Sequence, residues 1–312
     1  MPLIAGKMYR PTDVAVTTAN NSVFVVEQFN HRISKWEYTD TLYDFTLDTL
    51  WGSNGDGTSG IGAPIGDGGP TDNSLYRPTG IVWDGTRLIV TDTFHNRIRT
   101  LNASTGAWID STGQGGFGIS DFYHPAGIAF GGTTLVIADE LNHRAVKYTT
   151  GDLPTTPVLL PSPTPLGFNR PHGVSFDATN SLFNVTDTSH GVINNYSSDA
   201  SSFNSQFGTP GTTGTDLFFP GSGHRLLTGD LSTAFADTRN NILKTVAGTT
   251  IANTTGTAPG TGDGELYYPE SVESFMDSAT NYVVVPNTLN NRVESYSNTG
   301  AALTFQSNFG TP

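Results

Sequence analysis

The side chains that could bind a ligand or do chemistry lie at one position of a repeated phrase, shortly after a turn proline. The residue type at this position differs from copy to copy. The six residues at this position are Thr12, Thr79, Ala126, His172, Ser222 and Glu270. If the copies surround one axis, these residues open the innermost strands and meet at the mouth of a central channel, where ligands usually bind. An imidazole and a carboxylate can transfer protons or bind Zn²⁺ or Ca²⁺, so His172 and Glu270 are the candidates for catalysis or metal binding.

A catalytic metal site needs more ligands than this position supplies. A catalytic zinc takes three protein ligands and keeps one open position. His124 and His224 lie near equivalent turns, but His124 precedes its proline and His224 follows its glycine, out of register with His172. We therefore predict binding at the mouth, with no catalytic residue, metal or cofactor. A zinc- or calcium-dependent enzyme that uses His172 and Glu270 is the alternative.

A second repeated set lies at the end of the second strand of each copy. Its members are Glu27, Asp92, Asp139, Asp187, Asp237 and Asn287. They could form a cation-binding ring, but one such residue in every copy favours a structural role, in which each side chain accepts N–H groups of its own turn. We expect the arginines five residues later to pair with carboxylates, and the neighbouring histidines to be structural. These are Arg32, Arg97, Arg144 and Arg292, and His31, His95 and His143.

Both sets belong to a repeat of four short strands. In the second copy, two apolar strands flank the hairpin turn Asp84-Gly85-Thr86, and an alternating strand near Ile98 and an outer strand near Trp108 follow. From Pro78 onward the turn prolines recur every 46–49 residues, and no long helical pattern is present. Four antiparallel strands in each of six copies predict an all-β fold, a six-bladed β-propeller.

The repeats continue without a change of composition, so we predict a single domain over 1–312. The expected blades cover about 9–50, 76–116, 123–167, 169–214, 219–262 and 268–312, with a Gly/Asp-rich surface loop over 51–75. Counting back from Asp237 places Gly223 in register with the turn glycine of the other copies, which predicts a bulge in blade five. The ring is expected to close by packing blade one on blade six without a shared strand. A contribution of residues 2–5 is left open.

The phrase Pro-x-Gly-Ile/Val, followed by an apolar strand, Asp and Asn-His-Arg-Ile, resembles the NHL repeat. The connector 66–78 is similar to the glycine-rich connector of bacterial and teneurin-type members. The resemblance implies a six-bladed propeller that binds proteins, RNA or sugars. In one branch, the peptide-amidating lyases, it implies a zinc enzyme, and Pro171-His172-Gly173-Val174 is similar to the segment that supplies one zinc histidine. Lactonase-like propellers hold calcium with Glu, Asn and Asp. In this chain Glu270 alone matches that set of ligands.

The composition limits the class of partner. The chain has 15 Lys and Arg against 28 Asp and Glu, a net charge of −13 and a pI near 4.7. This balance argues against nucleic acid, because phosphate contacts require a positive surface. The chain has no cysteine, and we find no apolar signal core and no run long enough to span a membrane. A low-lysine surface rich in Thr, Ser, Asn and Gly is common in virion and extracellular proteins.

The sequence thus predicts a non-enzymatic binding or assembly module, a rigid acidic propeller whose loops contact a protein or glycan partner. A specific form is a structural or surface component of a virion or extracellular assembly. The alternative is a metal-dependent lyase or hydrolase at the channel mouth. Under the first hypothesis, changes in the 51–75 loop weaken association and His172→Ala has no effect; under the second, His172→Ala abolishes activity. The sequence does not assign an oligomeric state or a compartment.

Overall fold

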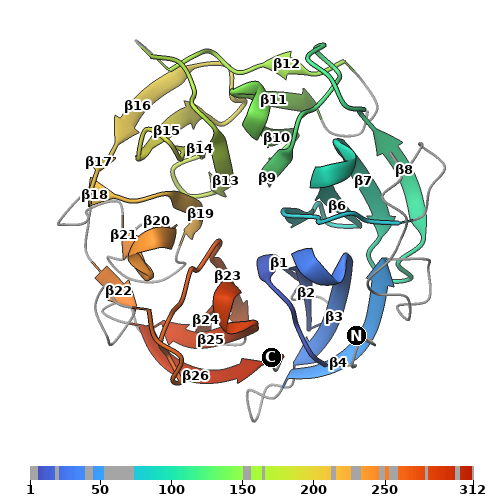
Figure 1. Ribbon diagram of the computed structural model, residues 1–312, viewed down its shortest axis with the longest axis vertical. Helices are drawn as coiled ribbons and strands as arrows, with labels where there is room; N and C mark the ends of the chain where they lie inside the picture. Colours follow the sequence, from blue (N-terminus) through green and yellow to red (C-terminus); the bar gives the residue numbers. More distant parts are fainter. Residues whose placement is uncertain are drawn as a thin grey trace.

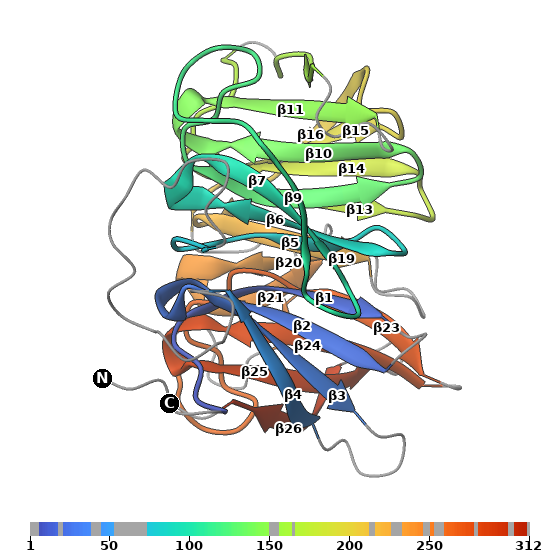
Figure 2. The ribbon, with the colours of Figure 1, turned by 90° about the vertical axis from the view of Figure 1, so that its right-hand side faces the viewer.

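The computed structural model describes residues 6–17, 21–38, 45–52, 74–149, 156–163, 166–211, 216–225, 233–245, 250–252, 259–277, 280–298 and 303–310. These residues form six four-stranded antiparallel sheets that surround a central axis as blades (Figure 1). The predicted all-β, six-bladed propeller is confirmed. In the side view, the strands of each blade run between the two faces of the disc (Figure 2). No helix of the described residues is long and apolar enough to cross a bilayer.

In every blade the chain moves from the innermost strand to the outermost. Blades one and two contain β1 (Pro11–Thr17), β2 (Ser22–Glu27), β3 (Arg32–Tyr38), β4 (Phe45–Gly52), β5 (Ile81–Trp83), β6 (Arg87–Asp92), β7 (Arg97–Asn102) and β8 (Trp108–Thr112). Blades three and four contain β9 (Pro125–Gly131), β10 (Thr134–Asp139), β11 (Arg144–Thr149), β12 (Val158–Leu159), β13 (Pro171–Asp177), β14 (Leu182–Asp187), β15 (Val192–Ser197) and β16 (Phe203–Phe207). Blades five and six contain β19 (Pro220–Arg225), β20 (Thr233–Asp237), β21 (Ile242–Thr245), β22 (Thr250–Ala252), β23 (Glu273–Asp277), β24 (Thr280–Asn287), β25 (Arg292–Asn298) and β26 (Leu303–Phe309). A short parallel pair, β17 (Thr209–Pro210) and β18 (Asp216–Leu217), links blades four and five.

A tight turn between the second and third strands explains the Asn/His/Arg phrase of the repeat. In five blades the turn is one turn of 3₁₀ helix: η2 (Gln28–Asn30), η4 (Thr93–His95), η5 (Glu140–Asn142), η6 (Thr238–Asn240) and η7 (Thr288–Asn290). The residue after each turn has a left-handed backbone, at φ between 52° and 59° for His31, Asn96, His143, Asn241 and Asn291. Asn tolerates this conformation well, and blade four uses Gly191 there.

In the five blades with a 3₁₀ turn, the same turn residue joins the blade to the next one. Its side chain accepts a hydrogen bond from the backbone N–H of the residue before the next turn proline. His31 Nδ1 accepts from Arg77 at 3.0 Å, and Asn96 Oδ1 accepts from His124 at 2.8 Å. The histidines of these turns are therefore structural, as the sequence indicated.

The acidic residues at the ends of the second strands are also structural, but in a different way from the prediction. They do not cap the five 3₁₀ turns. In blades two to six the side chain accepts a backbone N–H of the connector that enters its blade, such as Tyr76 N to Asp92 Oδ1 at 2.6 Å and Tyr123 N to Asp139 Oδ1 at 2.8 Å. Corresponding bonds reach Asp187, Asp237 and Asn287. In blades two to five the second oxygen binds a cation of the same blade, as Asp92 does with Arg97 Nε at 2.8 Å.

The glycine of the Pro-x-Gly phrase allows the innermost strands to approach closely. A Cβ atom on Gly80 would lie 2.5 Å from the carbonyl oxygen of Ala126, and one on Gly127 would lie 2.4 Å from that of His172. These distances are shorter than van der Waals contact, so a side chain would push neighbouring blades apart. Thr91 Oγ1 donates across the same interface to the Ala126 carbonyl at 2.6 Å.

Blade five contains the predicted irregularity, a register shift between Pro220 and Gly223, but Gly223 is not in register with the turn glycines of the other blades. Pro220 pairs with Asp237, the same pairing of proline and acidic residue that blades one, three and four show. The irregularity at this point is shared by those blades, and the extra residues of blade five lie in the hairpin between β19 and β20. Gly223 is therefore not the turn glycine. The residue after the proline is Gly221, so Gly221 and not Ser222 takes the channel position.

Blade one and blade six close the ring by packing, as predicted. Each has its own four strands. Tyr38 packs on Phe275 with ring centroids 5.0 Å apart, Thr288 Oγ1 donates to the Pro11 carbonyl at 2.7 Å, and Asn291 Oδ1 accepts from the Arg10 N–H at 2.8 Å. Residues 2–5 lie outside the described residues.

The predicted surface loop over 51–75 begins too early. Trp51 and Gly52 belong to β4, and Trp51 stacks on Phe24 with ring centroids 5.5 Å apart. At the other end Ser74 and Leu75 are buried. The rest of the loop, 53–73, lies outside the described residues.

Ile89 in β6 tests the packing between blades two and three. Its side chain is fully buried against Leu135 and other apolar residues of both blades. We expect Ile89→Ala to lower the free energy of unfolding by about 2–5 kcal/mol, because it leaves a cavity. Chemical denaturation measures this change. Ile109→Ala, at a 52% exposed position of β8, is the matched control and should be close to neutral. Equal losses in the two variants would contradict this packing.

Candidate functional site at the channel mouth

The main cavity lies at the mouth of the channel on the face that carries the 3₁₀ turns, which is turned toward the viewer in Figure 1. Its volume is about 310 Å³. One kind of residue reaches it from every blade, the residue before the turn proline: Arg10, Arg77, His124, Arg170, Phe219 and Tyr268. The first residues of several 3₁₀ turns complete the wall.

The structure brings part of the predicted residue set together. Thr79, His172 and Glu270 line the cavity, and Thr12 joins them in a narrower part below it. Thr12 is buried and donates to the Thr79 carbonyl at 2.8 Å, so it serves the interface between blades. Ala126 is fully buried.

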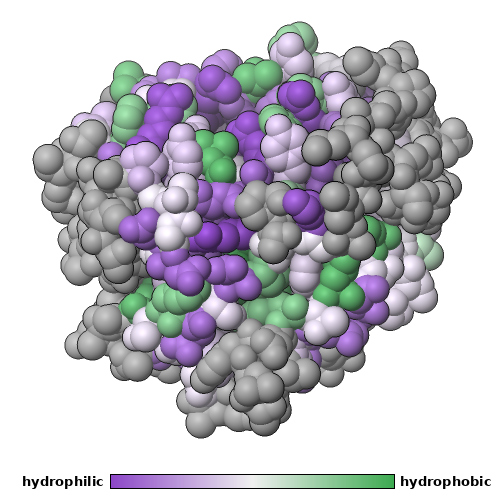
Figure 3. Space-filling view, turned by 60° about the horizontal axis from the view of Figure 1, so that its bottom comes forward, coloured by the Kyte–Doolittle hydropathy of each residue, from purple (hydrophilic) through white to green (hydrophobic). Residues whose placement is uncertain are grey.

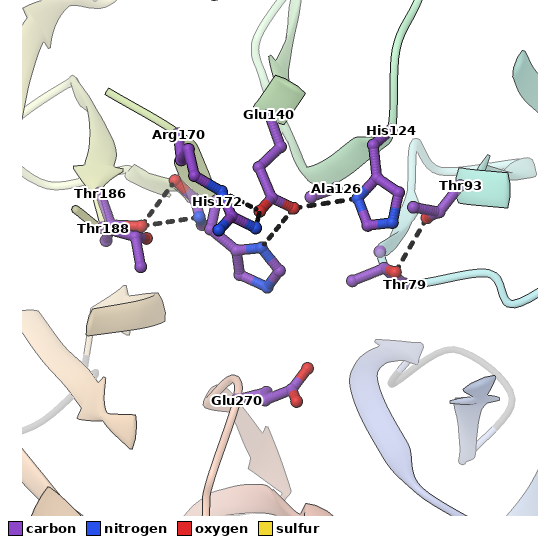
Figure 4. Close-up of polar contacts among 12 residues, drawn as sticks. Thr79, Thr93, His124, Ala126, Glu140, Arg170, His172, Thr186, Thr188 and Glu270 are labelled. Atoms are coloured by element: carbon purple, nitrogen blue, oxygen red, sulfur yellow. Dashed lines mark hydrogen bonds and ion pairs between the residues drawn. The ribbon is translucent and has the colours of Figure 1, made fainter. Parts of the chain in front are cut away.

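Glu140 is the central residue of the mouth, and sequence reasoning missed it. Its Oε1 accepts from Arg170 Nε at 3.0 Å, and its Oε2 lies 3.0 Å from His124 Nδ1 and 3.3 Å from His172 Nδ1 (Figure 4). The carboxylate is buried and comes from blade three, whereas Arg170 and His172 come from blade four. The sequence did contain a signal: Glu140 starts its 3₁₀ turn at a position where the other turns have Thr or Gln.

The partners of Glu140 fix the charge of the cluster. Burial by itself raises the pKa of Glu140, but hydrogen bonds and charge from His124 and His172 outweigh it and hold that pKa well below its ordinary value. Burial lowers the pKa of His172, and the hydrogen bond and charge of Glu140, with help from Glu270, overcome this and raise it. The cluster thus combines an ionised Glu140 with a His172 that keeps its proton to higher pH than a free imidazole.

Glu270 lies apart from the Glu140 cluster, across the mouth in Figure 4. Its Oε1 accepts from Arg10 Nη2 at 3.3 Å, so this ion pair joins blade six to blade one. Burial raises the pKa of Glu270, and the charges of His172 and Arg10 oppose the shift. Both carboxylates of the mouth are therefore held by arginines from the next blade.

Two further arginines of the mouth lie on aromatic rings. The guanidinium carbon of Arg77 is 4.8 Å from the ring centroids of both Phe29 and Phe94. That of Arg239 is 3.6 Å from the centroid of Phe219. Both rings attract the Arg77 guanidinium through cation–π contacts. The repeated Arg-Pro pairs were visible in the sequence but were interpreted as part of the frame.

Metal binding finds little support in this geometry. The Nδ1 atoms of His124 and His172 both face Glu140, and Glu270 faces Arg10. Among the described residues, no three His, Cys, Asp or Glu side chains are arranged to hold a metal ion. The His224 side chain lies outside the described set.

The opposite end of the channel holds a second cavity of about 170 Å³, lined by the innermost strands and the carboxyls of Asp13 and Glu273. Asp13 Oδ2 accepts the backbone N–H of Ile81 at 2.9 Å. Burial raises the pKa of Asp13 to about 7 and that of Glu273 to about 8. Near neutral pH Glu273 therefore mostly keeps its proton and Asp13 is about half ionised, so this end is less acidic than its composition indicates.

No protein-family model matches the sequence, and no curated protein matches it either. The fold is similar to that of a streptogramin B lyase, at 11% identity and a TM-score of 0.56, covering 99% of this chain and 85% of that chain. It is also similar to an auxiliary nutrient-binding protein from Bacteroides thetaiotaomicron (13% identity, TM-score 0.63, covering 96% and 70%) and to a chain of the nidogen–laminin complex (14%, 0.59, 92% and 92%). At these identities the similarity shows the propeller fold alone, and membership in the NHL family stays a prediction.

Replacing the central carboxylate should reverse the pKa shift of His172. In Glu140→Gln the burial of His172 is no longer offset, so we expect its midpoint to fall below the ordinary value of about 6.5. Titration of the imidazole resonances by NMR measures the shift. His190, which pairs with Asp187 in the same blade, is the internal control and should not move. An unchanged His172 midpoint would mean that Glu140 does not set its charge.

The raised pKa of Glu273 predicts how stability depends on pH. Between its ordinary value of 4.5 and about 8, the folded chain holds a proton that the unfolded chain has released. Stability contributed by this group therefore falls as pH rises through that window and is constant above it. We expect Glu273→Gln to have a higher melting temperature than wild type at pH 9 and a similar one at pH 4. The control is Glu37→Gln, at an exposed position, whose melting temperature should not show this dependence on pH.

Proposed function

We propose that this chain is a non-enzymatic binding module that holds a protein or glycan partner at the mouth and on the face around it. One observation carries the proposal: the acid–base groups of the mouth are engaged in ion pairs, while arginine and aromatic side chains are presented. Both oxygens of Glu140 and the Nδ1 atoms of His124 and His172 are used within the cluster. Glu270 is paired with Arg10. This arrangement suits recognition better than proton transfer.

Exposed aromatic residues around the mouth support a binding face. Phe94 and Phe218 lie beside the mouth arginines, and Tyr9 and Tyr123 precede Arg10 and His124 in the connectors; all four are exposed. Aromatic residues and arginine are enriched at binding sites because they combine a large contact area with polar groups. In the view of Figure 3, hydrophobic residues form small separate patches among hydrophilic ones. Such a mixed surface fits a reversible partner better than a permanent hydrophobic interface.

The finer parts of the proposal follow from the sequence. The repeat resembles the NHL repeat, whose members bind proteins or sugars, and the propeller is similar to that of a nutrient-binding protein and of a chain in the nidogen–laminin complex. The low lysine content and the net charge of −13 fit a structural or surface component of a virion or extracellular assembly. The same acidity disfavours nucleic acid as a partner.

A metal-dependent lyase or hydrolase at the mouth is the second candidate. Perturbed pKa values in a concave site are typical of catalytic groups, and His172, Glu140 and Glu270 all show them. The fold similarity to a streptogramin B lyase is compatible with this candidate. It requires His172 and Glu270 to release their present partners and bind zinc or calcium.

Two variants separate the candidates. We expect the double variant Phe94→Ser/Tyr123→Ser to lose binding on arrays of glycans and extracellular-matrix proteins, because it removes exposed aromatic contacts next to the mouth. His172→Ala should leave the metal content of the purified protein unchanged in elemental mass spectrometry. Ile109→Ser on the outer strand β8 is the control and should bind like wild type. Stoichiometric zinc or calcium that disappears in His172→Ala would favour the enzyme instead.

A further inference from the structure

We propose that the mouth binds an acidic saccharide, a short chain of uronic-acid sugars, whose carboxylates are held by Arg77 and Arg239. This inference rests on the proposed function and names the class of partner. It comes from the charge of the cavity, from the geometry of these two arginines and from the chemistry of the remaining wall.

The mouth concentrates positive charge in an otherwise acidic protein. The whole chain has 15 Lys and Arg, and four arginines line this one cavity: Arg10, Arg77, Arg170 and Arg239. The carboxylates of the lining are Glu140 and Glu270, and both are already paired. Two guanidinium charges therefore remain for a ligand, and a low-dielectric wall strengthens their field.

Arg77 is placed to recognise a carboxylate. Within the described part of the chain, its guanidinium makes no ion pair, and Phe29 and Phe94 contact it at equal distances of 4.8 Å. These ring contacts do not use the N–H donors of the guanidinium. A planar guanidinium edge matches a planar carboxylate through two parallel hydrogen bonds.

Arg239 supplies a second point of attachment from the other side. It is exposed, lies on Phe219 and makes no ion pair with any described residue. It belongs to η6 of blade five, and Arg77 precedes β5 of blade two, so the two arginines come from opposite blades of the ring (Figure 1). Two anchors on opposite sides of one cavity suit a ligand that carries two separated carboxylates.

The rest of the wall favours a saccharide over other acids. Gln28, Thr79 and Thr188 line the cavity and already bond within the protein: Gln28 Nε2 donates to Thr79 Oγ1 at 3.2 Å, and Thr188 Oγ1 donates to the Pro220 carbonyl at 3.1 Å. The side-chain oxygens of Gln28 and Thr188 can still accept hydrogen bonds from sugar hydroxyls. A volume of about 310 Å³ lies at the small end of the range for ligand pockets, about 300–1,000 Å³, and cannot admit a folded protein surface. An acidic peptide is the competing ligand, and the test includes it.

Isothermal titration calorimetry with short galacturonate oligomers tests the proposal on the full-length chain. We expect saturable binding that weakens as salt is added, because the contacts are ionic. Galactobiose, a neutral disaccharide, and the dipeptide Glu-Glu are the comparison ligands, and both should bind at least tenfold more weakly.

The variants assign the binding to the two arginines. We expect Arg77→Met and Arg239→Met each to weaken galacturonate binding about tenfold or more, which is the usual effect of losing a charge-assisted hydrogen bond. Methionine keeps an unbranched chain between the rings, so the fold should persist. Arg87→Met is the matched control: Arg87 lies in blade two and pairs with Asp84 in a hairpin far from the mouth, and its loss should not change binding. Melting curves check that all three variants fold.

Any other result contradicts the inference and indicates an alternative. Equal affinity for galactobiose means that no carboxylate is recognised, and tighter binding of Glu-Glu means that the ligand is a peptide. Galacturonate binding that survives in Arg77→Met places the ligand elsewhere. If no oligomer binds, the acidic saccharide is wrong. In all these cases the proposed binding module is tested separately, by the array experiment with the Phe94→Ser/Tyr123→Ser variant.

Discussion

The architecture depends on a hydrogen bond that recurs in blades two to six, from a connector N–H to the buried acceptor at the end of the second strand. In blades two to six an oxygen of Asp92, Asp139, Asp187, Asp237 or Asn287 accepts this bond. In four of these blades the other oxygen binds Arg97, Arg144, His190 or Lys244. A buried carboxylate left without partners costs several kcal/mol, so each acceptor fixes a connector and a cation at once. The acids of blades two to five, which could be taken for part of a cation site, are thereby used by the fold.

These hydrogen bonds also fix the backbone of the residues that line the mouth. Every residue before a turn proline has a left-handed backbone, with φ between 48° and 65°. This conformation is costly for a residue other than glycine, and the following proline excludes the ordinary helical one. Two anchors impose it: the acceptor of the same blade and the turn residue of the previous blade, as His31 does for Arg77. Side chains on such a backbone are fixed before a ligand arrives, which lowers the entropy lost on binding.

The parts of the structure that follow from one repeat could be predicted, and those that arise between repeats could not. The period of the prolines and the acidic strand ends gave six blades of four strands, because these depend on local spacing. Glu140 was visible as an exception at its position, but its partners Arg170 and His172 come from the next blade. The turn glycine of blade five was misplaced because counting cannot tell a longer hairpin from a bulge. The raised pKa of Asp13 reflects burial in the channel, which no motif records.

The arginines of the chain fall into two groups with different reasons to exist. Arg97 and Arg144 neutralise buried carboxylates, and the fold would lose several kcal/mol without such partners. Arg77 makes no ion pair with any described residue: it lies 4.8 Å from the centroids of two rings, and a cation–π contact at a partly exposed site is worth only about 0.5–1 kcal/mol. Stability therefore gives little reason to place a cation there, in a chain that has few. Recognition of an anion gives a stronger one, because the rings hold the guanidinium in place while its donors stay unpaired.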